Sequence, residues 1–99
     1  MTREEALKRI REAFPVLQEA YGLKSIDIFG SVARNEAQPG SDIDLLVSFQ
    51  PGKVCGYFGF FHLQQELEAI LGVRVDLVTP DALKKQLRAS ILAEAVHAA

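Results

Sequence analysis

The chain has 99 residues and a mass of 10.9 kDa, which is enough for one compact domain. Hydrophobic residues make up 48% and charged residues 24%, and this globular composition argues against a disordered chain. The formal net charge of -2 argues against direct, non-specific nucleic-acid binding, because such proteins present a basic surface to the phosphates. The single cysteine, Cys55, excludes an internal disulfide framework and a zinc site built on paired cysteines.

Two further patterns bear on location. No apolar run approaches the roughly 18–20 residues that span a bilayer. The first residues, Thr2 to Glu5, lack the basic start and the apolar stretch of a signal peptide. We therefore expect a cytoplasmic protein with no membrane segment.

The first segment predicts a helix. Thr2 and Glu5 have the spacing of a capping box, in which each side chain satisfies an unpaired backbone donor. Apolar residues then recur at helical spacing: Ala6, Leu7, Ile10, Ala13, Phe14 and Leu17. Pro15 lies inside this pattern, so we expect it to kink or split the helix, and Gly22 predicts the helix end.

Two strands are expected next, at residues 25–29 and 42–49. Asn, Pro, Gly and Ser residues between them predict a loop at 35–41, and a turn is predicted at 50–52. In the second strand, Asp42 and Asp44 lie on the face opposite to Ile43 and its alternate neighbours.

The second half predicts a helix at about 57–71, a strand at 73–78 and a last helix that begins at 79–81. Five residues of the last helix are expected to be buried: Leu83, Leu87, Ile91, Leu92 and Ala95. The predicted order is helix, strand, strand, helix, strand, helix. This is a small mixed α/β domain with an α+β arrangement.

Three acidic residues are placed on the predicted strands. Asp42 and Asp44 leave the same face about 7 Å apart, although Asp is depleted in strands and the two carboxylates repel each other. Standing alone, this pair would be two solvated acids on an exposed sheet face. Asp76 is a third acid on a strand, and three such carboxylates make an oxygen-rich site suited to Mg²⁺ or Mn²⁺. Two such ions can stabilise both the attacking and the leaving oxygen of a phosphoryl displacement.

Gly30 and Ser31 lie where the first strand ends and a helical turn can begin. Such a junction directs backbone N–H groups toward an anion, although Gly-Ser after a strand is more often only a turn and a helix cap.

Three motifs carry a family resemblance: GSVAR at 30–34, SDIDLLV at 41–47 and VDLV at 75–78. In this order they resemble the minimal nucleotidyltransferase (MNT) family of the DNA-polymerase-β-like nucleotidyltransferase superfamily. The resemblance covers the chain from about Lys24 to the final helix. It implies a polymerase-β-like fold, a small mixed β-sheet with helices packed on one side, in a single domain of residues 1–99.

The resemblance also implies roles for five residues. Asp42 and Asp44 would hold two Mg²⁺ ions, and Asp76 would hold the catalytic ion and help to deprotonate the acceptor hydroxyl. Gly30 and Ser31 would cradle the β- and γ-phosphates of ATP.

Two residues next to the Gly-Ser turn, Arg34 and Asn35, are interpreted separately. Asn35 departs from the family, in which many members have Gly, but Asn tolerates a left-handed backbone, so we expect the turn to form. Arg34 either binds phosphate or braces the loop through Glu36 or Asp42, and we leave it out of the catalytic set.

The chain ends soon after Asp76, so we expect the acceptor to arrive on another macromolecule. Residues 52–61 are a predicted docking surface, because they are glycine-rich and contain more apolar side chains than one small helix can bury: Val54, Tyr57, Phe58 and Phe61. The alternative is that these side chains simply cover the sheet.

In the MNT family the partner is commonly a HEPN-domain toxin, and the family activity is transfer of AMP from ATP to a tyrosine of that toxin. The resemblance therefore implies an antitoxin with this activity. The alternative is a non-catalytic antitoxin that binds and masks its partner. Transfer to RNA or to an aminoglycoside-like acceptor is a third hypothesis, disfavoured by the acidic charge balance.

Overall fold

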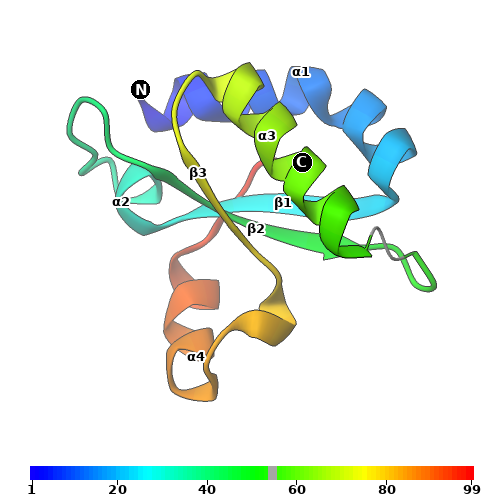
Figure 1. Ribbon diagram of the computed structural model, residues 1–99. Coiled ribbons are helices and arrows are strands. Elements are labelled where there is room, and N and C mark those ends of the chain that lie inside the picture. Colours follow the sequence, from blue (N-terminus) through cyan, green and yellow to red (C-terminus); the bar gives the residue numbers. More distant parts are fainter. Residues whose placement is uncertain (54–55) are drawn as a thin grey trace.

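The computed structural model describes residues 1–53 and 56–99, and it has a four-stranded mixed β-sheet with helices against it (Figure 1). The strands are β1 (Leu23–Phe29), β2 (Ile43–Phe49), β3 (Val75–Val78) and β4 (Val96–His97), in the spatial order β3-β2-β1-β4. The helices are α1 (Arg3–Tyr21), α2 (Gly30–Ala33), α3 (Gly56–Leu71) and α4 (Lys85–Glu94), with a 3-10 turn, η1, at Pro80–Ala82. This is the mixed α/β architecture predicted from the sequence.

Helix α1 begins and ends at the predicted residues. The side chain of Thr2 accepts a hydrogen bond of 3.1 Å from the backbone N–H of Glu5, and Gly22 ends the helix in the left-handed conformation with φ 71°. Of the two outcomes expected at Pro15, a kink or a split, the split is wrong, because the helix is continuous through that residue. Buried side chains on both sides of the proline, Ile10 and Leu17, hold the helix against the sheet and offset the lost backbone hydrogen bond.

The strand pairing determines where the acidic residues lie. β1 and β2 pair antiparallel, whereas β2 and β3 pair parallel through the crossover helix α3. In the parallel pair Asp44 is the register partner of Asp76. Two carboxylates that lie far apart in the sequence are therefore placed on adjacent strands at the same level of the sheet.

The two long helices, α1 and α3, pack on one face of the sheet, as the family resemblance implied, but α4 lies on the other side, so the expectation that the helices share one side is wrong for α4 (Figure 1). Alternate residues of β2, among them Ile43, Leu45 and Val47, are fully buried under the long helices. Asp44 faces the other side, where it is half-buried, and Asp76 is exposed. The acids thus lie on the sheet face that the long helices leave open.

The last third of the chain differs from the prediction. The expected single helix from Thr79 is divided into η1 and α4, and Thr79 makes no capping hydrogen bond through its side chain. Its expected buried face was also wrong: Leu87 is 53% and Leu92 is 48% exposed. Strand β4 was not predicted, because a strand of two residues has no readable periodicity.

The predicted docking surface is partly outside the described residues, since Val54 and Cys55 are not among them. The predicted exposure is confirmed for three aromatic residues at the start of α3: Tyr57 at 86%, Phe58 at 77% and Phe61 at 50%. They do not cover the sheet. Docking of a partner at this surface stays a prediction.

Candidate active site

The site is centred on Asp44 and Asp76. Each is the second residue of its strand, and their Cα atoms are paired across the parallel β2–β3 ladder. Asp42 lies one residue before β2 and is exposed to solvent. The structure therefore brings Asp44 and Asp76, two of the three predicted acids, into register on adjacent strands. It places the third, Asp42, directly before the start of β2.

The surroundings of Asp44 disfavour the ionised form of its carboxylate. Burial raises the pKa of Asp44 above its ordinary value, and the negative charges of Asp76 and Asp42 raise it further. A hydrogen bond with Asp76 acts in the same direction, and the positive charge of Arg34 opposes these effects. The site therefore concentrates negative charge that a cation would relieve.

This shift predicts a pH-dependent stability. Because the pKa of Asp44 is higher in the folded than in the unfolded chain, the folded state binds more protons, and the free energy of unfolding falls as pH rises from the ordinary value of 3.8 through the raised pKa. The Asp44→Asn variant lacks this loss, so its stability relative to the wild type should increase across that window and then stay constant. Urea denaturation at a series of pH values without divalent cations measures the difference. An unchanged difference, or the same trend in an exposed control, Asp81→Asn, would contradict this assignment.

The predicted Gly-Ser turn lies against the acids. Gly30 begins α2 directly after β1, with a left-handed φ of 73°. A Cβ at this position would lie 3.0 Å from Cγ of Asp44 and would overlap its carboxylate oxygen Oδ2. Glycine is therefore required here both for the backbone conformation and for the close approach of Asp44. Gly30 and Asp44, predicted as separate motifs, are in direct contact.

The turn is fixed at its other end. Arg3 of α1 donates a 2.9 Å hydrogen bond from Nη1 to the carbonyl of Ala33, and the N–H of Glu36 donates to the carbonyl of Ser31 at 2.8 Å. Asn35 has φ 58°, so the predicted tolerance for a left-handed backbone is confirmed. Ser31 is half-buried within this turn.

Arg34 braces the turn through two carboxylates. Its Nε lies 3.0 Å from Glu36 Oε2, which was one of the alternatives left open by the sequence, and its Nη1 lies 3.1 Å from Glu94 Oε2. The hydrogen bonds that Arg34 donates to Glu36, and next those it donates to Glu94, raise the pKa of Arg34. The partnership with Glu94 was not predicted, and no local pattern indicates it, because Glu94 is at the far end of the chain.

The carboxylates fit a divalent cation by chemistry, since Mg²⁺ prefers oxygen ligands and the site has an excess of negative charge. As the side chains stand, no group of three or more His, Cys, Asp or Glu residues in the described part of the chain is arranged to hold a metal ion. The ligand set of Asp42, Asp44 and Asp76 stays a prediction.

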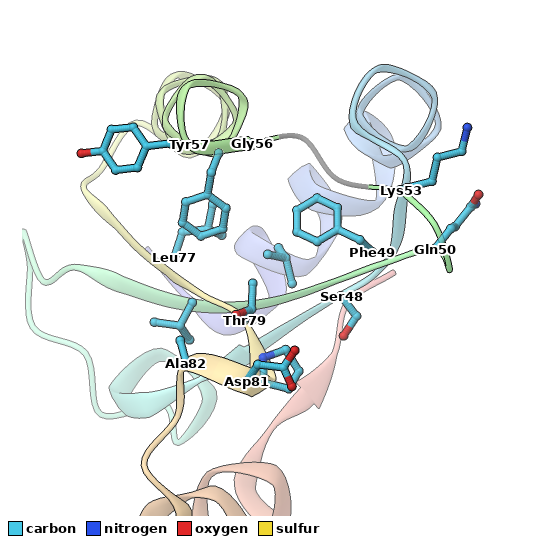
Figure 2. Close-up of a pocket in the computed structure, with 14 residues that line it drawn as sticks. Ser48, Phe49, Gln50, Lys53, Gly56, Tyr57, Leu77, Thr79, Asp81 and Ala82 are labelled. Atoms are coloured by element: carbon cyan, nitrogen blue, oxygen red, sulfur yellow. The ribbon is translucent and has the colours of Figure 1, made fainter.

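A second feature is a cavity of about 680 Å³ between the start of α3 and the segment from β3 to η1. Its walls include Phe49 and Leu77, with Tyr57 at one edge and Lys53 at the other (Figure 2). Among the described residues, none of the five predicted site residues lines it. The cavity is therefore separate from the acidic site, although Thr79 in its wall follows the strand that carries Asp76.

Comparison with known families agrees with this geometry. The family profile described as a nucleotidyltransferase domain matches residues 7–97, which include the Gly-Ser turn and all three acids. The chain belongs to the nucleotidyltransferase family. Among the described residues of this nucleotidyltransferase, no helix has the length and apolar character needed to cross a membrane.

Two of the similar proteins show the likeness over most of the chain. The chain is 41% identical over 81 residues to the protein adenylyltransferase MntA of Thermococcus cleftensis, covering 82% of this chain and 80% of the relative. It is 47% identical over 75 residues to a protein of Methanocaldococcus jannaschii provisionally assigned to the same activity, covering 76% of this chain and 74% of the relative.

Solved structures support the minimal nucleotidyltransferase fold. One provisionally described as a minimal nucleotidyltransferase has a TM-score of 0.76 and 42% identity, with 97% of this chain and 95% of that chain covered. Another contains a tri-AMPylated HEPN toxin of Shewanella oneidensis in complex with an MNT antitoxin. It has a TM-score of 0.67 at 20% identity, with 95% of this chain and 71% of that chain covered, and at this identity it supports the fold alone. The resemblance seen in the sequence is confirmed.

Proposed function

We propose that this nucleotidyltransferase transfers AMP from ATP to a tyrosine hydroxyl of a partner HEPN toxin and so acts as its antitoxin. The observation that carries the proposal is the contact of three motifs: Asp44 lies beside Asp76 across the β2–β3 ladder and against Gly30 of the turn. The activity named for the adenylyltransferase relatives supports the choice of AMP. The complex of an AMPylated HEPN toxin with an MNT antitoxin supports the choice of partner.

In the proposed reaction, the hydroxyl oxygen of the acceptor attacks the α-phosphorus of ATP and forms a new P–O bond. The bond from that phosphorus to the oxygen that bridges the α- and β-phosphates breaks, and pyrophosphate leaves with its electron pair. Asp76, exposed on the open face of the sheet, accepts the hydroxyl proton. Gly30 and Ser31 hold the β- and γ-phosphates through backbone N–H groups and a hydroxyl.

Asp42, Asp44 and Asp76 would hold two Mg²⁺ ions in this proposal. When bound, the ions supply positive charge beside the reacting phosphate. The raised pKa of Asp44 supports such a role, because a bound cation stabilises the ionised carboxylate that burial and its neighbours disfavour. We expect the single domain of residues 1–99 to act in the cytoplasm, where ATP is available.

Radiolabelled ATP tests the proposed reaction. With purified protein, its cognate toxin and Mg²⁺, label in the α-phosphate should appear on the toxin, whereas label in the γ-phosphate should not. Asp42→Asn/Asp44→Asn is the control and should transfer neither. Transfer of the γ-label would indicate a kinase. A stable complex that neutralises the toxin with no label from either position would instead support the masking antitoxin.

A further inference from the structure

The carboxylate of Glu94 is bound to the turn that carries Gly30. Its Oε1 accepts a 3.0 Å hydrogen bond from the backbone N–H of Gly30 and a 3.2 Å hydrogen bond from Nη1 of Arg34. Its Oε2 accepts a second bond from the same Nη1 at 3.1 Å. One anionic group thus occupies both a backbone donor of the turn and the adjacent guanidinium.

The backbone N–H of Gly30 and the guanidinium of Arg34 can bind a phosphate as well as a carboxylate, because each donates N–H hydrogen bonds to an anionic oxygen. We propose that Glu94 occupies the position of a nucleotide phosphate in the free protein, and that ATP must displace it to bind. This inference rests on the proposed function, since it concerns the turn to which ATP is assigned. Glu94 then lowers the affinity for ATP, and its release couples nucleotide binding to a movement of α4.

The packing of α4 is suited to such a movement. Glu94 is the last residue of this helix, all of whose residues are described, and none of its side chains is fully buried. Leu87 and Leu92 remain about half exposed, so displacing the helix removes little apolar surface from the core. The segment that follows is anchored independently, because β4 pairs with β1 and Ala98 is buried.

The ion pair itself is weak enough to be exchanged. The side chains of Arg34 and Glu94 are 45% and 30% exposed, and partly solvated pairs of this kind are screened by water. A triphosphate brings several charges to the same donors. Competition by Glu94 therefore reduces nucleotide affinity without preventing binding.

The test compares Glu94→Gln with Glu36→Gln. Both variants remove one negative charge from Arg34, but only Glu94 also occupies the N–H of Gly30. Calorimetric titration with ATP and Mg²⁺ should give about tenfold tighter binding for Glu94→Gln than for the wild type, as expected if the blocked form dominates about nine to one. Glu36→Gln should differ from the wild type by less than about twofold.

Other results of this titration separate failure of the inference from failure of the proposed function. Equal or weaker ATP binding by Glu94→Gln, with normal AMP transfer by the wild type, would overturn the inference and leave the proposed function intact. If neither the wild type nor any variant binds ATP, the proposed function fails, and the inference fails with it. If Glu94→Gln does not fold, Glu94→Asp replaces it. Asp keeps the charge but has a shorter reach, so a several-fold gain in affinity is expected, and no gain would overturn the inference.

Discussion

Replacing Asp44 by asparagine is expected to reduce AMP transfer by about a thousandfold or more, while the folded protein keeps or gains stability at neutral pH. The loss follows from removing a charged oxygen from the proposed cation site, where metal-assisted charge stabilisation is worth several kcal/mol and about 1.4 kcal/mol corresponds to a factor of ten. The retained stability follows from the raised pKa of Asp44. A neutral asparagine removes the cost of burying a negative charge at this position and the repulsion by Asp76 and Asp42.

Initial rates of AMP transfer and the midpoint of thermal unfolding measure the two effects. Asp81→Asn is the matched control, since it removes one carboxylate from an exposed position outside the site. It should keep its activity within about twofold. An Asp44→Asn enzyme with activity within tenfold of the wild type, or one that is strongly destabilised, would contradict the role given to Asp44.

Gly30→Ala is expected to reduce both stability and activity. Comparison with Gly40→Ala separates the effect of backbone strain from the effect of the overlap with Asp44. Both glycines have left-handed φ values, 73° and 82°, and an alanine there costs about 1–2 kcal/mol from backbone strain. At Gly40 a Cβ meets no atom within 4 Å, whereas at Gly30 it overlaps the carboxylate of Asp44. Gly30→Ala should therefore lose a further 1–3 kcal/mol or so from overpacking, together with about a hundredfold of activity as Asp44 is displaced.

Urea denaturation and AMP-transfer rates of the two variants provide the measurement. The overlap with Asp44 also predicts that the additional penalty disappears when Gly30→Ala is introduced into an Asp44→Ala background. Equal destabilisation of Gly30→Ala and Gly40→Ala, with equal activity, would show that the contact between Gly30 and Asp44 has no importance.

Local patterns in the sequence predicted the elements that position the site. The Thr2 cap, the Gly22 end and the alternation through Asp44 depend on residues near one another in the chain, and the structure confirms all three. The sequence placed Asp44 and Asp76 on predicted strands and led to the prediction that their carboxylates share one oxygen-rich site. The register that pairs their Cα atoms was supplied only by the structure.

The features that the sequence did not predict depend on contacts between distant residues. The exposure of Leu87 reflects where α4 lies relative to the sheet, which helical periodicity does not encode. The continuity of α1 through Pro15 depends on burial against the sheet rather than on local propensity. The hydrogen bond from Gly30 to Glu94 joins the two halves of the chain, and only the folded chain brings them together.

In the proposed reaction, the contact of Asp44, Asp76 and Gly30 forms an adenylyl-transfer site. The most direct measurement is the intact mass of the proposed partner toxin after incubation with this protein, ATP and Mg²⁺. We expect one or more additions of the mass of AMP, located on tyrosine by peptide fragmentation and absent with Asp42→Asn/Asp44→Asn. An unmodified toxin in a stable complex with the wild-type protein would contradict the claim.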